Sequence, residues 1–291
     1  MLNRCDKMKA RVRFGPAGIP RGSPKQDLYS GVEYTGELKL DAFECEFSRG
    51  VRLNKEVALR VRKLANDSDI SLSCHAPYWV NACSKEKVKI ETSIRNIMEA
   101  ARAAHLLGAG IIVFHPGFYM GKSSEECAAI AKKTLQVCIE KMGEEKINNV
   151  FLGPETTGKL SQYGSLSEVL DLCSSLERCK PTIDFAHLHA RGIKLKKKED
   201  YKEIFDKIEK ELGGSALKEL HTHFSEVEYT KKGERRHLVL GTNNEPPFRP
   251  LSEAIVENGY GATIISESPL LEIDALKMKN AYVSLLSKKG K

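Results

Sequence analysis

The stretch GIIVFHPG at residues 110–117 is a short apolar run that ends in a histidine followed by a proline. The same arrangement recurs along the chain, where a His, Asp or Glu closes each of six such runs: His75, His115, Glu155, Asp184, His223 and Glu267. Their spacings of roughly 30 to 45 residues match the length of one strand–helix unit. Because the carboxyl ends of parallel strands converge on one face of a barrel, we expect these six side chains to form one cluster.

Eight apolar runs are the expected strands, at 10–15, 40–47, 71–76, 110–116, 150–155, 181–186, 217–225 and 262–268. Helical periodicity fills the intervals at 55–68, 93–108, 123–143, 165–176, 198–214 and 250–261, with Gly108 and Gly143 as expected helix stops. Strands that alternate with helices predict parallel pairing and right-handed crossovers. The chain length of 291 residues suits one (β/α)8 TIM barrel. We therefore expect an α/β fold with a single domain over residues 1–291.

An open doubly wound sheet is the alternative fold for this alternation. Such a sheet needs a glycine-rich phosphate loop after an early strand, and the early segment GPAGIPRGSP at 15–24 does not match that pattern. The closed barrel is therefore the preferred prediction.

The composition, with 41% hydrophobic and 29% charged residues, is typical of a soluble globular protein. No apolar run reaches the roughly 18 residues that cross a bilayer, and the first residues lack the apolar core of a secretory signal. The eight cysteines form no CxxC pair, which favours reduced thiols over a disulfide framework. We expect a cytoplasmic protein without a membrane partner. Because neighbours on a strand face opposite ways, Cys74 should point away from any site that His75 enters.

The net charge of +7 is compatible with a nucleic-acid partner without requiring one. Positive residues concentrate at 193–198, at 231–236 and in the final residues of the chain. The run at 231–236 follows a candidate active-site strand and is a candidate for phosphate contact, whereas a solvated surface is the plainer interpretation of the other two.

The residue types at the strand ends are those that bind metals. His75 and His115 each precede a proline within two residues, which ends the strand and fixes the side chain at the rim. Glu155 and Asp184 follow apolar strands, and a buried carboxylate must be paired or bind a cation. Hydrogen bonding for the histidines and helix capping for the carboxylates are the structural alternatives. Three carboxylates among histidines favour a site with more than one ion, because a glutamate can bridge two cations.

The remaining histidines differ in their context. His187 and His189 share one loop, and His221 shares a strand with His223, so members of each pair would lie on one face of an extended segment. His237 follows the seventh strand beside two arginines, where a surface histidine is the alternative. His105 lies inside a predicted helix and is expected on its face.

With these residues collected, the chain resembles the endonuclease IV family of apurinic/apyrimidinic (AP) endonucleases, within the xylose-isomerase-like TIM barrels. The most specific stretches are CHAPYWVN at 74–81, VFHPGFYMG at 113–121, GPETTGK at 153–159, IDFAHLHARG at 183–192 and HTHFSE at 221–226. The resemblance implies a centre of up to three metal ions, usually zinc, at the carboxyl end of the barrel. It also implies cleavage of the DNA backbone on the 5′ side of an abasic site, as in base excision repair.

Residue by residue, the resemblance implies two complete ligand sets: His75, His115 and Glu155 for the first ion, then Glu155, Asp184, His223 and Glu267 for the second. Glu155 and Glu267 would also orient or deprotonate the attacking water. Tyr78 and, in the loop after the second strand, Arg49 would enter the DNA. The expected cofactor is two or three Zn²⁺ ions, with Mn²⁺ or another divalent ion as the alternative. The expected partner is double-stranded DNA with abasic sites, bound by a monomer.

The third ion would be held by His187 and His237, and here the chain departs from the family. The family uses an Asp-x-His pair, but Arg235 stands two residues before His237. Glu234 is one residue further away and would substitute only if the loop shifts. The resemblance therefore implies an incomplete third set.

Two other functions fit the same residues. A sugar isomerase or epimerase on this barrel would use one divalent ion, held by Glu155, Asp184, His223 and Glu267. A non-catalytic barrel that binds abasic DNA or metal would keep two sites without turnover. His75, His115, His187 and His237 are additional to that single-ion set, which favours the nuclease. Counting the metal ions bound per chain distinguishes the nuclease from the isomerase or epimerase.

Overall fold

The apolar runs form eight parallel strands in the computed structural model, which describes residues 10–289. They are β1 (Val12–Pro16), β2 (Ala42–Glu46), β3 (Ser71–His75), β4 (Ile111–Phe114), β6 (Phe151–Pro154), β8 (Thr182–Asp184), β9 (Leu220–Phe224) and β12 (Ala262–Ser266). Seven lie within the runs that the sequence predicts to be strands, and β1 extends one residue beyond its predicted run, to Pro16. The first nine residues, which include Cys5 and both Met1 and Met8, lie outside the described residues.

The eight strands close into a barrel through two seams. They form two four-stranded parallel sheets, in the orders β1-β12-β9-β8 and β2-β3-β4-β6. At one seam Ala17 pairs with Glu44, where the amide of Gly18 donates to the Glu44 carbonyl at 2.9 Å. At the other seam Glu155, which follows β6, pairs with Thr182 of β8. The predicted (β/α)8 barrel is confirmed.

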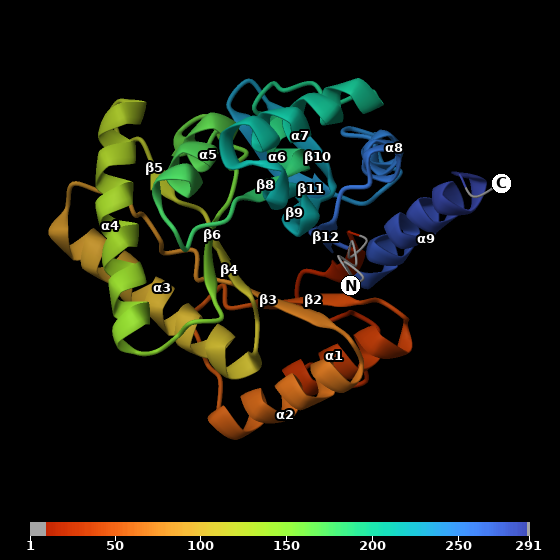
Figure 1. The fold of residues 1–291 in the computed structure, drawn as a ribbon, viewed down its shortest axis with the longest axis horizontal. Coiled ribbons are helices and arrows are strands. Elements are labelled where there is room, and N and C mark those ends of the chain that lie inside the picture. The colour runs from red at the N-terminus through yellow and green to blue at the C-terminus, as the bar shows by residue number, and fades with distance from the viewer. Residues whose placement is uncertain (1–9, 290–291) are drawn as a thin grey trace, which may run out of the picture.

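Helices surround the strands on the outside, as Figure 1 shows. They are α1 (Leu28–Glu37), α2 (Lys55–Asp67), α3 (Lys87–Leu107), α4 (Ser124–Glu144), α5 (Leu166–Ser175), α7 (Lys198–Leu212), α8 (Phe248–Asn258) and α9 (Glu272–Lys289), with the short α6 (Phe185–Ala190) and the 3-10 turn η1 (Gly214–Lys218). The six predicted helices are present, whereas α1, α6 and α9 were not predicted. Gly108 ends α3 in the left-handed conformation, but α4 continues past Gly143 to Glu144. Among residues 10–289, no helix is both long and apolar enough to cross a membrane.

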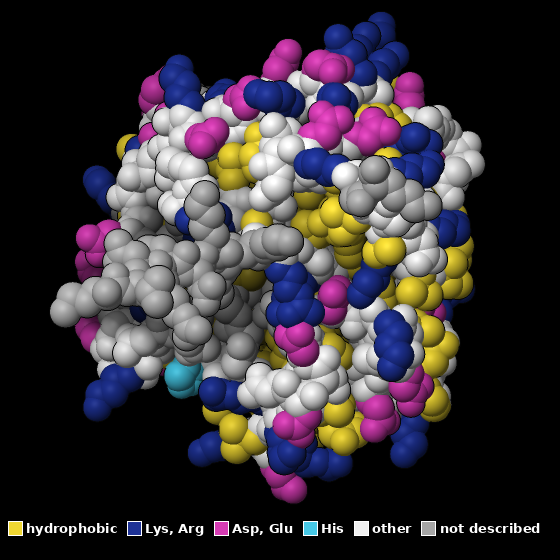
Figure 2. All heavy atoms as spheres, turned by 45° about the vertical axis from the view of Figure 1, so that its right-hand side comes forward, with side chains coloured by type: hydrophobic (Ala, Val, Ile, Leu, Met, Phe, Trp, Pro, Cys, Tyr) yellow, Lys and Arg dark blue, Asp and Glu magenta, His cyan; other side chains and the backbone are white. Residues whose placement is uncertain are grey.

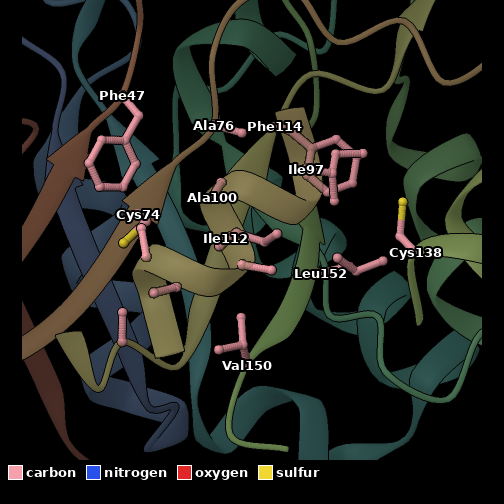
Figure 3. Close-up of a cluster of buried hydrophobic side chains, with 14 of the residues drawn as sticks. Phe47, Cys74, Ala76, Ile97, Ala100, Ile112, Phe114, Cys138, Val150 and Leu152 are labelled. Carbon is pink, nitrogen blue, oxygen red and sulfur yellow. The ribbon is translucent and has the colours of Figure 1, made fainter. Parts of the chain in front are cut away.

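The apolar core lies between the outer faces of the strands and the helices. Figure 3 shows Cys74, Ile112 and Leu152 of β3, β4 and β6 beside Ile97 and Ala100 of α3. Cys74 therefore points out of the barrel, as predicted, and the alternation along β3 directs its neighbour inward. The seven cysteines among the described residues are all buried and free, as expected for reduced thiols.

Two antiparallel ribbons extend from the carboxyl ends of the strands. The first pairs β5 (Gly117–Phe118) with β7 (Gln162–Tyr163), and the second is the hairpin of β10 (Glu226–Thr230) and β11 (Gly233–Leu238). The carboxylate of Glu226 accepts hydrogen bonds from the backbone amides of residues 241–244, which fixes the loop after the hairpin. These ribbons form part of the wall around the site.

Candidate metal centre

The six strand-end residues meet at the carboxyl end of the barrel, as the sequence predicts. His75, Asp184 and His223 belong to β3, β8 and β9, whereas His115, Glu155 and Glu267 lie one residue beyond β4, β6 and β12. Donor atoms of these residues fall into overlapping groups within 4.8 Å, one with His75, His115 and Glu155, another with Glu155, Asp184, His223 and Glu267. Distant parts of the chain are thus brought together by parallel strands that end at one level.

Glu155 is shared by both groups and is fully buried. Its Oε2 lies 3.0 Å from Nε2 of His115 and 3.4 Å from Nε2 of His75. Its Oε1 lies 3.2 Å from Nδ1 of His223 and 3.3 Å from Nδ1 of His187. One carboxylate oxygen therefore faces each group, which is the arrangement that a bridging ligand requires.

The histidine rings are oriented by acceptors outside the cluster. Nδ1 of His75 lies 2.9 Å from the Ala76 carbonyl, and Nδ1 of His187 lies 2.8 Å from the Thr156 carbonyl. A carbonyl accepts only, so these Nδ1 atoms carry a proton and donate it, which leaves Nε2 of each ring directed away from its anchor. Metal-binding histidines in proteins are anchored in this way by their second nitrogen.

Asp184 has one carboxylate oxygen in use and one without a partner. Oδ1 caps α6 by accepting the His187 amide at 2.6 Å, so the capping alternative holds for that atom. Oδ2 is buried and has no hydrogen-bond partner among the described residues. Burial raises the pKa of this carboxyl to about 6, although nearby His187 opposes the shift. An anionic oxygen that is buried without a donor fits a bound cation.

A third group contains Asp184, His187, His237 and Glu267. His237 is anchored like the others, since its Nδ1 lies 2.6 Å from the Ser225 hydroxyl, which itself donates to the Glu226 carbonyl. Its Nε2 lies 3.3 Å from Oε2 of Glu267. His237 thus faces the cluster and is not a surface residue.

Glu234 brings a carboxylate close to His187 and His237, although it stands three residues before His237 and the family's Asp-x-His spacing is two. Oε2 of Glu234 lies 3.5 Å from Nε2 of His187, and Oε1 lies 4.0 Å from Nε2 of His237. Arg235 points outward instead and pairs with Glu228, as does Arg236. Where the resemblance implies an incomplete third set, the structure thus places the carboxylate of the neighbouring residue beside both histidines.

A β-bulge explains this change of register. In the hairpin Glu228 pairs with Arg236 and Tyr229 with Glu234, so Arg235 has no partner on β10. Three positions apart on a regular strand, Glu234 and His237 would face opposite ways, but one extra residue returns them to the same face. Gly158 and Gly233 permit the close packing, since a Cβ on Gly233 would lie 2.2 Å from the Gly158 carbonyl oxygen.

Buried carboxylates in and around the cluster attract positive charge. Burial alone would lower the pKa of His75, but the charges of Glu46 and Glu155 raise it to about 10. Burial raises the pKa of Glu46 to about 7. Such a site favours cations, and divalent ions that accept mixed His and carboxylate ligands fit the donor set.

A cavity of about 500 Å³ opens over the cluster, lined by residues that include His115, His237, Glu267, Tyr78 and Lys159. Tyr78 is 65% exposed at its rim, and its neighbour Trp79 is 71% exposed. Arg49 is exposed in the loop between β2 and α2. Trp79 was missed from the sequence, although its position beside Tyr78 in CHAPYWVN was a signal.

Positive charge is not concentrated on the side of the molecule near α8 and α9. Figure 2 shows Lys and Arg intermixed with Asp and Glu on the described part of that face. Among the described residues that line the cavity, Lys159 is the one lysine or arginine.

The chain belongs to the xylose isomerase-like TIM barrel family, whose pattern matches residues 32–280. It is 38% identical over 275 residues to an uncharacterized protein of Methanocaldococcus jannaschii, covering 94% of this chain and 97% of the relative. It is 28% identical over 184 residues to an apurinic-apyrimidinic endonuclease of Caenorhabditis elegans, covering 61% of this chain and 45% of that relative.

Two solved structures share the fold at similar levels. A D-tagatose 3-epimerase-like protein matches with a TM-score of 0.71 and 20% identity, over 95% of this chain and 100% of that chain. Endonuclease IV from Thermus thermophilus matches with a TM-score of 0.70 and 18% identity, over 94% of this chain and 99% of that chain. The two likenesses show the barrel, and the choice between the two activities depends on the site itself.

Proposed function

We propose that this protein is a metal-dependent phosphodiesterase of the endonuclease IV type, which cleaves DNA on the 5′ side of abasic sites. The observation that carries the proposal is the carboxylate of Glu234 beside the third group, 3.5 Å from His187 and 4.0 Å from His237. A sugar epimerase with one ion needs four ligands, and Glu155, Asp184, His223 and Glu267 already provide them. The additional groups match the several ions of a phosphodiester hydrolase.

His75, His115 and Glu155 would hold one ion, Glu155, Asp184, His223 and Glu267 a second, and His187, Glu234 and His237 a third. When bound, zinc ions supply Lewis-acid stabilisation of the phosphate and activation of water. Glu267 is better placed than the fully buried Glu155 to orient the attacking water, because it lines the cavity. Lys159 in the same wall would bind a phosphate of the DNA strand.

Tyr78 and Trp79 would recognise the lesion. Tyr78 lines the cavity and its sequence neighbour Trp79 is exposed, so both rings are available to stack on the bases that flank a gap. An abasic sugar has no base to hold it in the helix, so turning it into the cavity costs less than flipping a normal nucleotide. Arg49, exposed in the β2–α2 loop, would contact the backbone nearby.

The proposal is tested with a duplex that carries a tetrahydrofuran abasic analogue, incubated with zinc-loaded protein. We expect one cut on the 5′ side of the lesion that leaves a 3′-hydroxyl, and none in the undamaged duplex. Glu267→Gln should abolish the cut while the protein still binds the damaged duplex. Metal-loaded protein that leaves the lesion uncut would sink the proposal.

The second candidate is a sugar isomerase or epimerase, favoured by the four-ligand group and the epimerase-like structural relative. Metal content separates the two, since this activity predicts one ion per chain. Interconversion of ketoses by the protein, together with a single bound ion, would decide in its favour.

A further inference from the structure

A second group of acidic and histidine side chains lies inside the barrel next to the proposed metal centre. Glu44 on β2 is fully buried, and it contacts Ser73 of β3 and both His221 and His223 of β9. The sequence shows the signal, because two glutamates alternate in the strand DAFECEF and so share one face. None of the proposed metal sites includes Glu44.

The two oxygens of Glu44 have different surroundings. Oε2 accepts the hydroxyl of Ser73 at 2.6 Å and lies 2.9 Å from Nε2 of His221. Oε1 lies 2.9 Å from Nε2 of His223. Oε1 of Glu44 and Nε2 of His223 are both buried, and neither makes a hydrogen bond to a described residue. A small rotation of the carboxylate toward the ring N–H would give each atom the other as its partner. Ser73 and His221 thus hold one oxygen and leave the other for His223.

His223 presents the opposite ring nitrogen to the metal centre from the other histidines. Its Nδ1 faces the cluster, 3.0 Å from Oε1 of Glu267 and 3.2 Å from Oε1 of Glu155. His75, His187 and His237 instead use Nδ1 for their outside anchors. A ring turned this way needs an acceptor at Nε2, and Glu44 is the acceptor within reach.

We infer that Glu44 is a positioning residue for His223: it accepts a hydrogen bond from the Nε2–H group and so fixes the tautomer in which the Nδ1 lone pair is directed at the metal centre. This inference rests on the proposed function, because it assumes that His223 is a ligand. A carboxylate in this place also makes the imidazole a stronger donor than a neutral acceptor would, and loss of such partners typically weakens metal binding by about 10–100-fold.

The test combines a direct view of the ring with a variant. In zinc-loaded protein labelled with ¹⁵N, the ring shifts of His223 should show the proton on Nε2 and none on Nδ1. Glu44→Gln should bind zinc about 10–100-fold more weakly in competition with a chelator. Glu168→Gln is the matched control, since it changes another buried, hydrogen-bonded glutamate that lies outside the cluster, and its zinc affinity should equal that of the wild type.

Two results would overturn the inference. A proton on Nδ1 of His223 in the wild type would do so without any variant. The inference would also be overturned if the single variant His221→Gln lost one zinc ion that the wild type binds. Glu44, His221 and His223 would then form a separate metal site. Failure of the proposed function is distinguishable, since protein that binds zinc with the expected tautomer but leaves abasic DNA uncut contradicts only the nuclease assignment.

Discussion

Replacement of Glu234 tests whether the bulged hairpin completes the third ligand set. Glu234→Gln keeps the size of the side chain but removes its charge, which lies 3.5 Å from His187 and 4.0 Å from His237. Two unit charges about 4 Å apart interact with about 4 kcal/mol at an effective dielectric constant of 20. Since about 1.4 kcal/mol corresponds to a tenfold change in affinity, we expect the variant to bind the third ion, held by His187, Glu234 and His237, roughly a thousandfold less tightly.

Elemental analysis after dialysis against a chelator measures this effect. Glu234→Gln should retain one zinc ion fewer than the wild type and lose incision activity with it. Deletion of Arg235 is the matched control. Without the extra residue β11 becomes regular, and Glu234 and His237 stand two positions apart on the same face, so the deletion variant should keep its zinc.

A double variant supplies the result that would refute this reasoning. Glu234→Gln combined with Arg235→Asp places a carboxylate at the family's usual spacing from His237, but on the outer face of the bulged strand. It should therefore fail to restore the lost ion. Restored zinc and activity in that variant would show that the bulge does not fix which side chain enters the site.

Three further outcomes are expected. Gly158→Ala should lower zinc content while the protein stays folded, because its Cβ would lie 2.5 Å from Cβ of Glu234 and 2.8 Å from Cδ2 of His187; unchanged zinc content would show that the hairpin can move away. Burial alone would raise the pKa of Glu168, but hydrogen bonds from Ser124, Tyr119 and two backbone amides lower it below its usual value. The ionised Glu168 therefore stabilises the folded protein above about pH 4.3, and this stabilisation is lost as the pH falls through the pKa of the folded state. Glu168→Gln should therefore lower the free energy of unfolding by about 1–3 kcal/mol at pH 7 and by less below pH 4, measured by denaturant titration; a pH-independent loss would contradict this. Trp79→Ala should weaken binding to abasic duplex in fluorescence anisotropy by about 1–3 kcal/mol, with the melting temperature and zinc content unchanged; equal loss of binding to undamaged duplex would argue against a role in recognising the lesion.

The elements that show a regular pattern of apolar residues along the sequence were predicted well. All eight barrel strands were found, because apolar runs of strand length recur between helical segments, whereas the short strands β5, β7, β10 and β11 of the two ribbons were not. The cluster of six His, Asp and Glu residues followed from the ends of the barrel strands. The helix α1 was missed because it follows a loop rich in proline and glycine and its apolar pattern is short.

The approach of Glu234 to the third ligand group could not be predicted in the same way. The side chain that enters the site depends on the bulge at Arg235, and the bulge depends on how β11 packs against Gly158 and Lys159, far away in the sequence. Glu44 was predictable in part, since two glutamates in an apolar strand are unusual, but its partner His223 became visible only when β2 and β9 were placed in one barrel.

The bulge in the hairpin also bears on how relatives of this protein can diverge. A strand that accommodates one inserted residue without moving its acidic side chain allows the chain length to change while the ligand is retained. A search for the Asp-x-His spacing would then reject sequences that keep the chemistry in three dimensions. Evolution within this barrel can therefore vary the spacing of that pair, provided that the glycines at 158 and 233 still let the ribbon close over the site.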